Sequence, residues 1–247
     1  ANNLMSGFMS NPMEFAEASK VAIYSVANYA WNINKYDWIA TWENALKNVM
    51  PNNYEAFRTF SIHNADLGPN GHGYRRDESW EFKKTAHTYL QNTKIGEFDL
   101  NSLQKVQQEF MKIIMAARAL QNSKDNDALI EEITPWLKQF SLLGESGLAT
   151  TYLQTALMQN DKSTFDKLYN HVKLVKEEMY NISNTLNQNP YQPGVKTGSL
   201  VVEPLIDSLL VELSKQYTEK FGEQLSSIAN YTPHLIYSNL AQVEKLP

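Results

Sequence analysis

The stretch FDKLYNHVKLVKEEMYNISNTL, residues 165–186, decides the fold of this chain. Its apolar side chains follow one another at alternating spacings of 3 and 4 residues, at Phe165, Leu168, Val172, Val175, Met179, Ile182 and Leu186. This heptad pattern predicts a helix that packs at a shallow angle in a left-handed bundle. A coiled coil with a second chain is the alternative. We favour a partner within the chain, because neighbouring segments are helical and the flanking charges do not alternate as paired zipper positions do.

The segments on both sides of this stretch also repeat apolar residues at helical spacing. We expect helices at about residues 12–36, 37–50, 53–65, 79–92, 99–121, 127–159 and 201–221. Asp99 is expected to cap the start of its helix. The segment 127–159 is expected to bend or restart at Pro135 and again between Gly144 and Gly147, giving two or three shorter helices. The reason is that proline removes an amide donor and clashes with the preceding turn.

Composition agrees with a helical chain of ordinary globular type. The 247 residues include only 10 glycines and 9 prolines, too few for the many turns of an all-β sandwich or barrel. A chain of this length can bury a sizeable core without metals or crosslinks. We therefore predict an all-α fold, a multihelical bundle of long helices with two long loops, at 66–78 and 189–199. The apolar run Leu4–Ser10, which ends at Asn11-Pro12, predicts a short strand that leads into the first helix.

The first expected helix, 12–36, is apolar on nearly every side, so we expect it to have partners on two sides. Tryptophans on apolar helical faces could stack on sugar rings, but we predict that they belong to the core. They are Trp31, Trp38, Trp42 and Trp136.

Charge and cysteine content exclude several classes of function. With 22 basic and 27 acidic side chains the net charge is −5, and no basic run exceeds Arg75-Arg76, so we expect no nucleic-acid partner and no anionic membrane partner. The absence of an 18-residue apolar window predicts no membrane span. The chain has no cysteine, which excludes disulfides, thiolate nucleophiles and cysteine-based zinc or iron–sulfur sites.

Histidines and acidic residues gather around the first loop, but their spacing does not match a known metal motif. The cluster comprises His63, Asp66, His72, Asp77 and Glu78. A metal site there is one interpretation, and hydrogen bonds that order the loop are the favoured one, so we expect no metal and no cofactor. The loop lacks the glycine patterns that cradle phosphates, and the chain shows no serine in a nucleophile elbow.

Three polar residues near the start of the first helix are candidate site residues. Asn11 lies at a strand-to-helix junction, where parallel α/β folds place ligand contacts, but on the residues alone a helix cap is the favoured interpretation. Glu14 and Glu17 could act as an acid/base pair, but a role at the positive end of the helix dipole is favoured. A glycosidase needs two carboxyl groups at a fixed separation, or one acid and participation by the substrate, and this chain contains no adjacent aspartate pair. The residues alone therefore describe a helical domain without a visible active site.

Several spaced clusters nevertheless resemble one family. They are Asn11-Pro12-Met13, Glu17-Ala18-Ser19-Lys20, Tyr29, Trp31-Asn32, Trp42, the loop residues 67–76, Gln192-Pro193-Gly194-Val195-Lys196, Pro204, Asp207 and Pro233-His234. These clusters are similar to the last barrel element and the post-catalytic helical region of bacterial family 84 glycoside hydrolases. That family comprises the O-GlcNAcase and hyaluronidase-type β-N-acetylglucosaminidases. The resemblance runs through almost the whole chain.

The resemblance implies a parent enzyme with a TIM-like barrel that removes N-acetylglucosamine. In that family two consecutive aspartates assist the reaction, and the acetamido group of the substrate acts as nucleophile. Both aspartates would lie upstream of Ala1. Residues 1–36 would be the last strand and helix of the barrel, and 37–247 the hyaluronidase-like post-catalytic domain. By motif match Asn11 would bind sugar hydroxyls in the intact parent. We expect no catalytic residue in this chain and no activity from it alone.

The same resemblance implies the partners and the location of the protein. The partners would be its own upstream barrel, downstream modules and, in the parent, an N-acetylglucosaminide substrate; the location would be secreted, periplasmic or at the bacterial cell surface. Cut from its barrel, Leu4–Ser10 would be a strand with unpaired edges, so we expect it to be disordered, refolded or paired with a neighbour. The alternative function is a helical module that binds a protein or a glycan through the loop at 66–78.

Overall fold

The computed structural model describes Gly7, Met9, residues 14–65, 78–188 and 194–229, Tyr231 and Pro233. Within this part the regular elements are helices, apart from one isolated bridge residue, so the predicted all-α fold is confirmed. The α-helices are α1 (Ala16–Trp31), α2 (Trp38–Val49), α3 (Tyr54–Ile62), α4 (Lys83–Lys94), α5 (Leu100–Gln121), α6 (Asp127–Met158), α7 (Lys162–Thr185) and α8 (Val202–Phe221); a short 3-10 helix, η2 (Ile33–Lys35), follows α1. The predicted strand Leu4–Ser10 lies outside the described residues except for Gly7 and Met9, which have no regular structure.

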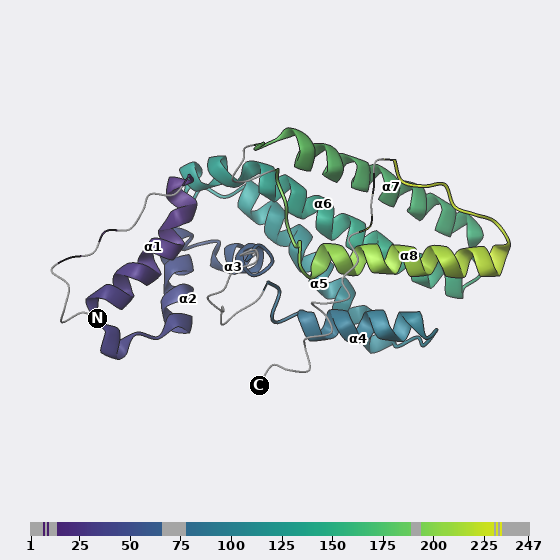
Figure 1. Ribbon diagram of the computed structural model, residues 1–247, viewed down its shortest axis with the longest axis horizontal. Coiled ribbons are helices and arrows are strands. Elements are labelled where there is room, and N and C mark those ends of the chain that lie inside the picture. The colour runs from purple at the N-terminus through teal and green to yellow at the C-terminus, as the bar shows by residue number, and fades with distance from the viewer. Residues whose placement is uncertain are drawn as a thin grey trace.

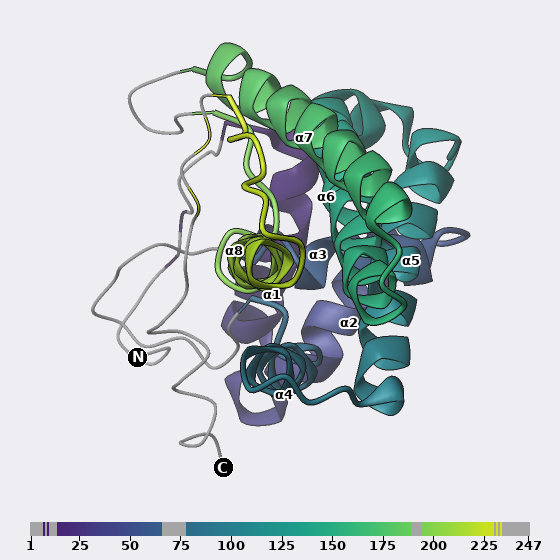
Figure 2. The same ribbon diagram turned by 90° about the vertical axis from the view of Figure 1, so that its right-hand side faces the viewer.

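The long helices form a bundle around α6, which packs against α5, α7 and α8. Helix α4 lies beside α5 and α8 on another side of the bundle, while α1 and α2 pair at one end of it (Figure 1). Figure 2, turned to look along the bundle, shows α8 and α4 end-on beside α6 and α5. The helices therefore form two parts, the bundle itself and the α1–α2 pair, in which α1 packs against α6.

Local signals placed most helix starts correctly. The carboxylate of Asp37 accepts hydrogen bonds from the amides of Ile39 and Ala40, and that of Asp99 accepts one from Asn101. A side chain at this position satisfies amides that the first helical turn leaves without a partner. The predicted cap at Asp99 is therefore confirmed.

The heptad pattern of residues 165–186 is buried within the chain. Phe165, Val172 and Met179 are almost fully buried on the side of α7 that packs against the bundle. Leu186, the last position of the pattern, follows the end of α7 and is 42% exposed. The packing partner is α6 of the same molecule, so the prediction of an intramolecular bundle is confirmed and the coiled-coil alternative is wrong.

The expected break in the segment 127–159 is wrong, because α6 is one continuous helix with Pro135 inside it. Proline deprives the carbonyl of Glu131 of its amide partner. Glu131 and Thr134 are exposed, so water can reach this side of the helix. The Thr134 hydroxyl also donates to the carbonyl of Ile130, at 2.6 Å. Access of water and the Thr134 hydrogen bond offset the free-energy cost of the proline, and the helix continues without a break.

The two glycines of α6 are packing positions rather than breaks. A Cβ added at Gly147 would lie 2.3 Å from Cε1 of Phe110, and one added at Gly144 would lie 2.7 Å from Cγ1 of Ile114. Phe110 and Ile114 belong to α5, which packs against this stretch of α6. Glycine lets the two helices approach closely here, and any Cβ would force Phe110 or Ile114 to move.

The predicted burial of the tryptophans holds only in part. Trp42 and Trp136 are partly buried against the core, and Trp42 contacts Trp80 edge-on with 5.6 Å between ring centroids. Trp38 is also partly buried. Trp31, however, is 93% exposed, so its predicted place in a core is wrong for this chain. Its side chain lies at the end of α1, where the described part of the chain offers no covering layer.

Candidate functional site

The start of α1 is held by a residue of the bundle rather than by its own cap. Phe15, at the N-cap position, makes no side-chain capping hydrogen bond. Instead the carboxylate of Glu132, on α6, accepts from the amide of Glu17 at 3.0 Å to each oxygen and from the amide of Ala18 at 3.0 Å. A carboxylate is favoured at a helix start, because the free amides and the helix dipole make that end positive. Helix α6 therefore fixes where α1 begins.

Two further contacts hold the same region. The Glu17 carboxylate accepts from Nζ of Lys20 at 2.6 Å and from Nδ2 of Asn126 at 2.9 Å, and these bonds lower the pKa of Glu17. Phe15 meets Trp136 of α6 edge-on, with 5.4 Å between ring centroids. Glu17 is thus occupied in fixing the helix start, which supports the interpretation of a role at the helix end over that of an acid/base pair.

Asn11, the candidate substrate-binding residue, lies outside the described residues. It precedes Phe15 by four positions, so even a fully extended chain places its Cα no more than about 14 Å from that of Phe15. Asn11 is therefore close in the sequence to the start of α1.

The outer face of α1 is apolar and exposed. Only Ser19 of this helix is buried, whereas Ile23 is 41% exposed, Tyr29 43% and Trp31 93%. Ile39, on the paired helix α2, is 41% exposed as well. Grouped exposed apolar side chains mark a contact surface more often than a free one. Ile23 and Trp31 lie about 80° apart around the helix, whereas Tyr29 lies about 160° from Trp31 and meets Tyr36 edge-on with 5.3 Å between ring centroids. We call Ile23 and Trp31 the open face of α1.

A second group of polar residues is buried where α3, α4 and α5 meet. Nδ1 of His63 lies 2.8 Å from Oγ of Ser79, and Nε2 lies 3.0 Å from Oε1 of Glu109. Burial would raise the pKa of Glu109, but the hydrogen bond and charge of His63, with help from Lys112, hold that pKa below its usual value. The order serine, histidine, carboxylate is that of a nucleophilic triad.

The hydrogen bonds of this group connect two segments of the chain, and the group does not have the accessibility of a catalytic site. His63 and Ser79 are fully buried, so a substrate cannot reach the serine oxygen. The amide of Ser79 also donates to the carbonyl of Ile62 at 2.9 Å, and the residue has a φ of +56°. The site therefore joins the two ends of the predicted loop 66–78 across the start of the α4 region.

The ends of both predicted loops converge at the start of α8. The carboxylate of Glu78 accepts from the amides of Leu200 and Val201 at 3.1 Å, and the carbonyl of His63 accepts from the amide of Gly198 at 2.9 Å. His63 and Glu78 thus make hydrogen bonds of the predicted kind, which order the ends of the loops. Asp66, His72 and Asp77 lie outside the described residues. Among the residues that are described, the structure contains no group of three acidic or histidine side chains suited to a metal ion.

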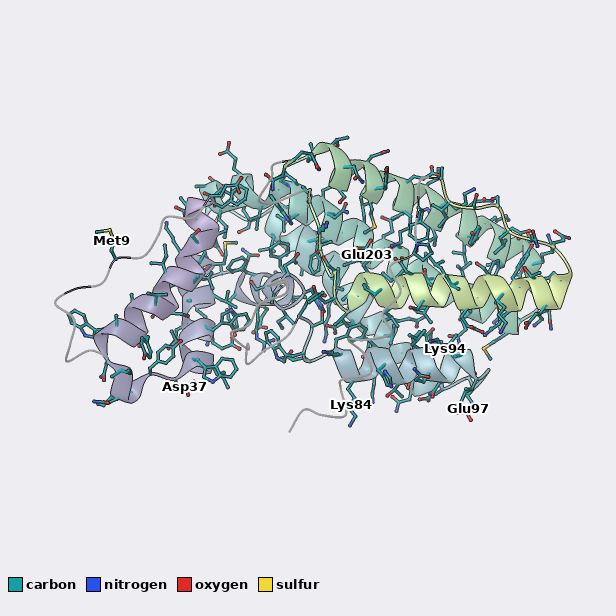
Figure 3. The ribbon with its side chains drawn as sticks, in the orientation of Figure 1. Met9, Asp37, Lys84, Lys94, Glu97 and Glu203 are labelled. Atoms are coloured by element: carbon teal, nitrogen blue, oxygen red, sulfur yellow. The ribbon has the colours of Figure 1, made fainter. Side chains whose placement is uncertain are left out.

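A buried ionic cluster joins α7 to α8. Nζ of Lys176 lies 2.7 Å from Oδ1 of Asp207 and 3.4 Å from Oε1 of Glu203, and the ring of Tyr231 covers the ammonium with its centroid 5.4 Å away. Figure 3 shows Glu203 near the start of α8, in the region between this helix and α7. Burial lowers the pKa of Lys176, yet the two carboxylates more than offset this and raise it, so the pair is ionic. Sequence reasoning missed Lys176, whose only signal was a charged residue beside Val175 on an apolar face.

The described surface offers little for glycoside chemistry. An open groove of about 560 Å³ lies between α5 and α6, and its lining consists of glutamine, methionine, lysine, leucine and tyrosine side chains. A groove without a carboxylate lacks the pair of carboxyl groups that most glycosidases use as acid and base. In addition, none of the described helices is long and apolar enough to cross a membrane.

Comparison with known proteins connects these features to one family. The family model described as "Bacterial GH84, post-catalytic domain" matches residues 78–210, and the model described as "beta-N-acetylglucosaminidase" matches residues 1–62. Among solved structures, CpGH84D is similar at 27% identity with a TM-score of 0.72, over 83% of this chain and 34% of that one. CpGH84B shares the fold at 24% identity with a TM-score of 0.70, over 84% of this chain and 34% of that one.

The chain thus spans about a third of the length of these two structures. The post-catalytic match alone covers more than half of the chain and includes the whole of α4 to α7. The helical bundle is the part of such enzymes that follows the catalytic one and does not itself catalyse. The chain belongs to glycoside hydrolase family 84, and its bundle is the post-catalytic helical domain of that bacterial family.

Proposed function

We propose that this chain forms the end of a catalytic barrel, residues 1–36, and the helical domain, residues 37–247, of a β-N-acetylglucosaminidase. Its role is to hold the last helix of that barrel in place. The observation that carries the proposal is the asymmetry of α1, whose start is fixed to α6 while Trp31, at its end, is 93% exposed in the described chain. The match of residues 1–62 to a β-N-acetylglucosaminidase model includes α1, which supports assigning this helix to the catalytic part; the match itself extends beyond residue 36, to the end of α3.

The open face would be buried against the barrel. Full burial of one large apolar side chain contributes about 1.5–3 kcal/mol, so covering Trp31, which is 93% exposed, supplies about that much docking energy, and Ile23, which is 41% exposed, adds a smaller amount. Helix α1 would then be packed on two sides, as its all-round apolar sequence predicts. The helical domain would pack against the barrel and connect it to downstream modules.

The parent reaction would take place outside this chain. Two consecutive aspartates upstream of Ala1 would assist the acetamido group of the substrate, which attacks as nucleophile. Asn11 would contribute binding: its side-chain amide can donate to and accept from sugar hydroxyls, but it cannot act as a general acid or base. We propose an N-acetylglucosaminide as substrate and a secreted, periplasmic or cell-surface location for the bacterial protein.

The docking of α1 is tested by a substitution that acts only when the barrel is present. Trp31→Ser should leave the melting temperature of this chain within about 1 °C, because the side chain is 93% exposed. In a version extended upstream through the barrel, the same change should lower the melting temperature by several degrees. Ile95→Ser, which alters a residue 67% exposed at the end of α4, is the matched control and should have no effect in either version. Equal responses to Trp31→Ser in both versions would contradict the proposal.

A further inference from the structure

We infer that the groove between α5 and α6 binds an acidic amphipathic helix of another protein. The groove measures about 560 Å³, is open to solvent, and is lined by residues of these two helices. The proposed docking of α1 on a barrel does not involve this face of the bundle. The inference is therefore independent of the proposed function.

The α5 side of the groove is a stripe with the spacing of a helix seam. Gln104, Gln108, Met111 and Met115 follow one another at spacings of 4, 3 and 4 residues. At about 100° per residue these four positions lie within about 60° of one another around the helix axis. The same spacing places the side chains of one coiled-coil helix against its partner. The stripe therefore offers a seam about 17 Å long to a further helix.

The apolar side chains of the groove are exposed. Met111 is 43% exposed and Met115 63%, and on α6 Tyr152 is 46% exposed, four residues after the partly buried Leu148. Grouped exposed apolar side chains mark a contact surface more often than a free one. Methionine is also suited to contact with a partner, because its unbranched side chain adapts to the shape that it meets.

The two helices that form the groove are fixed relative to each other. Nε2 of Gln107 on α5 donates to Oγ1 of Thr151 on α6 at 3.1 Å. Behind this bond, Gly144 and Gly147 let α6 approach α5 closely. A shallow channel between two packed helices accepts the side-chain ridge of a third helix. The geometry therefore favours a helix as the ligand over an extended peptide, which would bind to the edge of a sheet.

Basic side chains flank and extend the stripe. Lys105 directly follows Gln104, and Lys112 directly follows Met111, so the two lysines stand seven residues apart on the same side of the seam. The next seam position, three residues after Met115, is the exposed Arg118. Charges beside a helix seam decide which partner it accepts. Cations spaced by about one heptad therefore select a helix with carboxylates at the same spacing.

The carboxylates near these cations do not cancel this preference. Glu109 accepts from Nζ of Lys112 at 3.1 Å, but it also bonds to Nε2 of His63 at 3.0 Å and its side chain is only 16% exposed, against 65% for Lys112. Asp99, whose charge acts on Lys105, caps the start of α5 and precedes the stripe. A helix lying in the groove would therefore meet exposed cations, although the whole chain carries a net charge of −5.

The composition of the stripe favours a separate, reversibly bound protein. Two of its four positions are glutamine, whereas interfaces that stay covered are more apolar. A second copy of this chain is disfavoured by charge, because a two-fold interface brings the same patch onto itself and would bring the lysine flanks together.

The probe is a fluorescent peptide of three heptads, with leucine at the seam positions and glutamate at the flanking positions. Fluorescence anisotropy gives its Kd for the purified chain. Two control peptides carry lysine in place of the flanking glutamates, or serine in place of the seam leucines. Analytical ultracentrifugation of the chain without peptide gives its oligomeric state.

The chain variants separate the apolar and the charged contributions. Met115→Ser removes a seam residue, and its matched control is Met158→Ser, which alters a residue 47% exposed at the end of α6 and outside the groove. Lys112→Glu reverses a flanking charge, and its matched control is Lys215→Glu on α8, whose side chain is also 65% exposed and paired with a carboxylate of its own helix. Lys105→Glu repeats the charge test without removing the partner of Glu109.

We expect Met115→Ser, Lys112→Glu and Lys105→Glu each to raise the Kd of the glutamate peptide by about 3- to 10-fold, and both controls to leave it unchanged. The Kd should also rise with salt concentration. If the glutamate peptide binds no more tightly than the lysine or serine peptide at concentrations up to about 1 mM, the inference is wrong. An unchanged Kd in Met115→Ser would also overturn it. A dimer of the chain that Met115→Ser dissociates would assign the groove to a second copy and would overturn the inference as well.

Discussion

Replacing Gly147 by alanine should destabilise the bundle although alanine favours helices. The added Cβ would lie 2.3 Å from Cε1, 2.5 Å from Cδ1 and 2.6 Å from Cζ of Phe110, and ordinary contact begins only at 3.4 Å. The ring must therefore move by about 1 Å, and it is fully buried and packed edge-on against Phe82, with 6.3 Å between centroids. Such overpacking costs about 1–3 kcal/mol.

The helix propensity of alanine offsets part of this cost. Alanine is favoured over glycine by about 1 kcal/mol inside a helix, so the net loss of unfolding free energy should be up to about 2 kcal/mol. For a chain of this size that corresponds to a melting temperature lower by up to about 8 °C. Urea unfolding followed by circular dichroism measures the free energy, and a thermal scan measures the temperature.

A double-mutant cycle with Phe110→Leu tests the stated cause. Leucine removes the ring that the new methyl group meets, so the double variant should be more stable than the sum of the single changes predicts. A Gly147→Ala variant that is more stable than the parent chain would refute the reasoning. It would mean that α5 and α6 do not approach as closely as the Phe110 contact requires.

Two further predictions concern the buried ionic groups. The lowered pKa of Glu109 gives stability that is present above its unfolded value near 4.3 and is lost as the pH falls through the folded value; Glu109→Gln should therefore reduce the difference between unfolding midpoints in urea at pH 7 and pH 4. An unchanged difference would contradict the role of its bond to His63. Lys176→Met leaves Asp207 buried without its cation and should cost about 3–5 kcal/mol, whereas Lys176→Met with Asp207→Leu should recover most of that loss. Equal losses in the single and double variants would show that the pair is not coupled.

Local signals in the sequence predicted the features whose cause is local. The heptad spacing of α7 and the cap at Asp99 depend on residues within a few positions of each other, and both are confirmed. The predicted break in α6 is wrong, because Pro135 and Gly147 indicate a break only when the segment is considered by itself. What keeps α6 continuous is water access beside Pro135 and the close approach of Phe110, and neither is visible in a single segment.

The candidate site was predictable only in part for the same reason. Asn11 was singled out by its position at a junction and by a resemblance, and nothing in its neighbourhood of the sequence indicates what holds it. Glu132 is 115 residues from the amide of Glu17 that it accepts from, so no local pattern connects them. Trp31 illustrates a different limit: an apolar residue predicts that a contact exists but does not name the partner.

The central claim is that this chain supports a catalytic barrel and does not itself cleave glycosides. The direct measurement is hydrolysis of an aryl β-N-acetylglucosaminide by the purified chain, beside a version extended upstream through the barrel. We predict activity in the extended version and none above background in the chain alone. Hydrolysis by the chain alone would contradict the account, because it would require an acid and a base within residues 1–247.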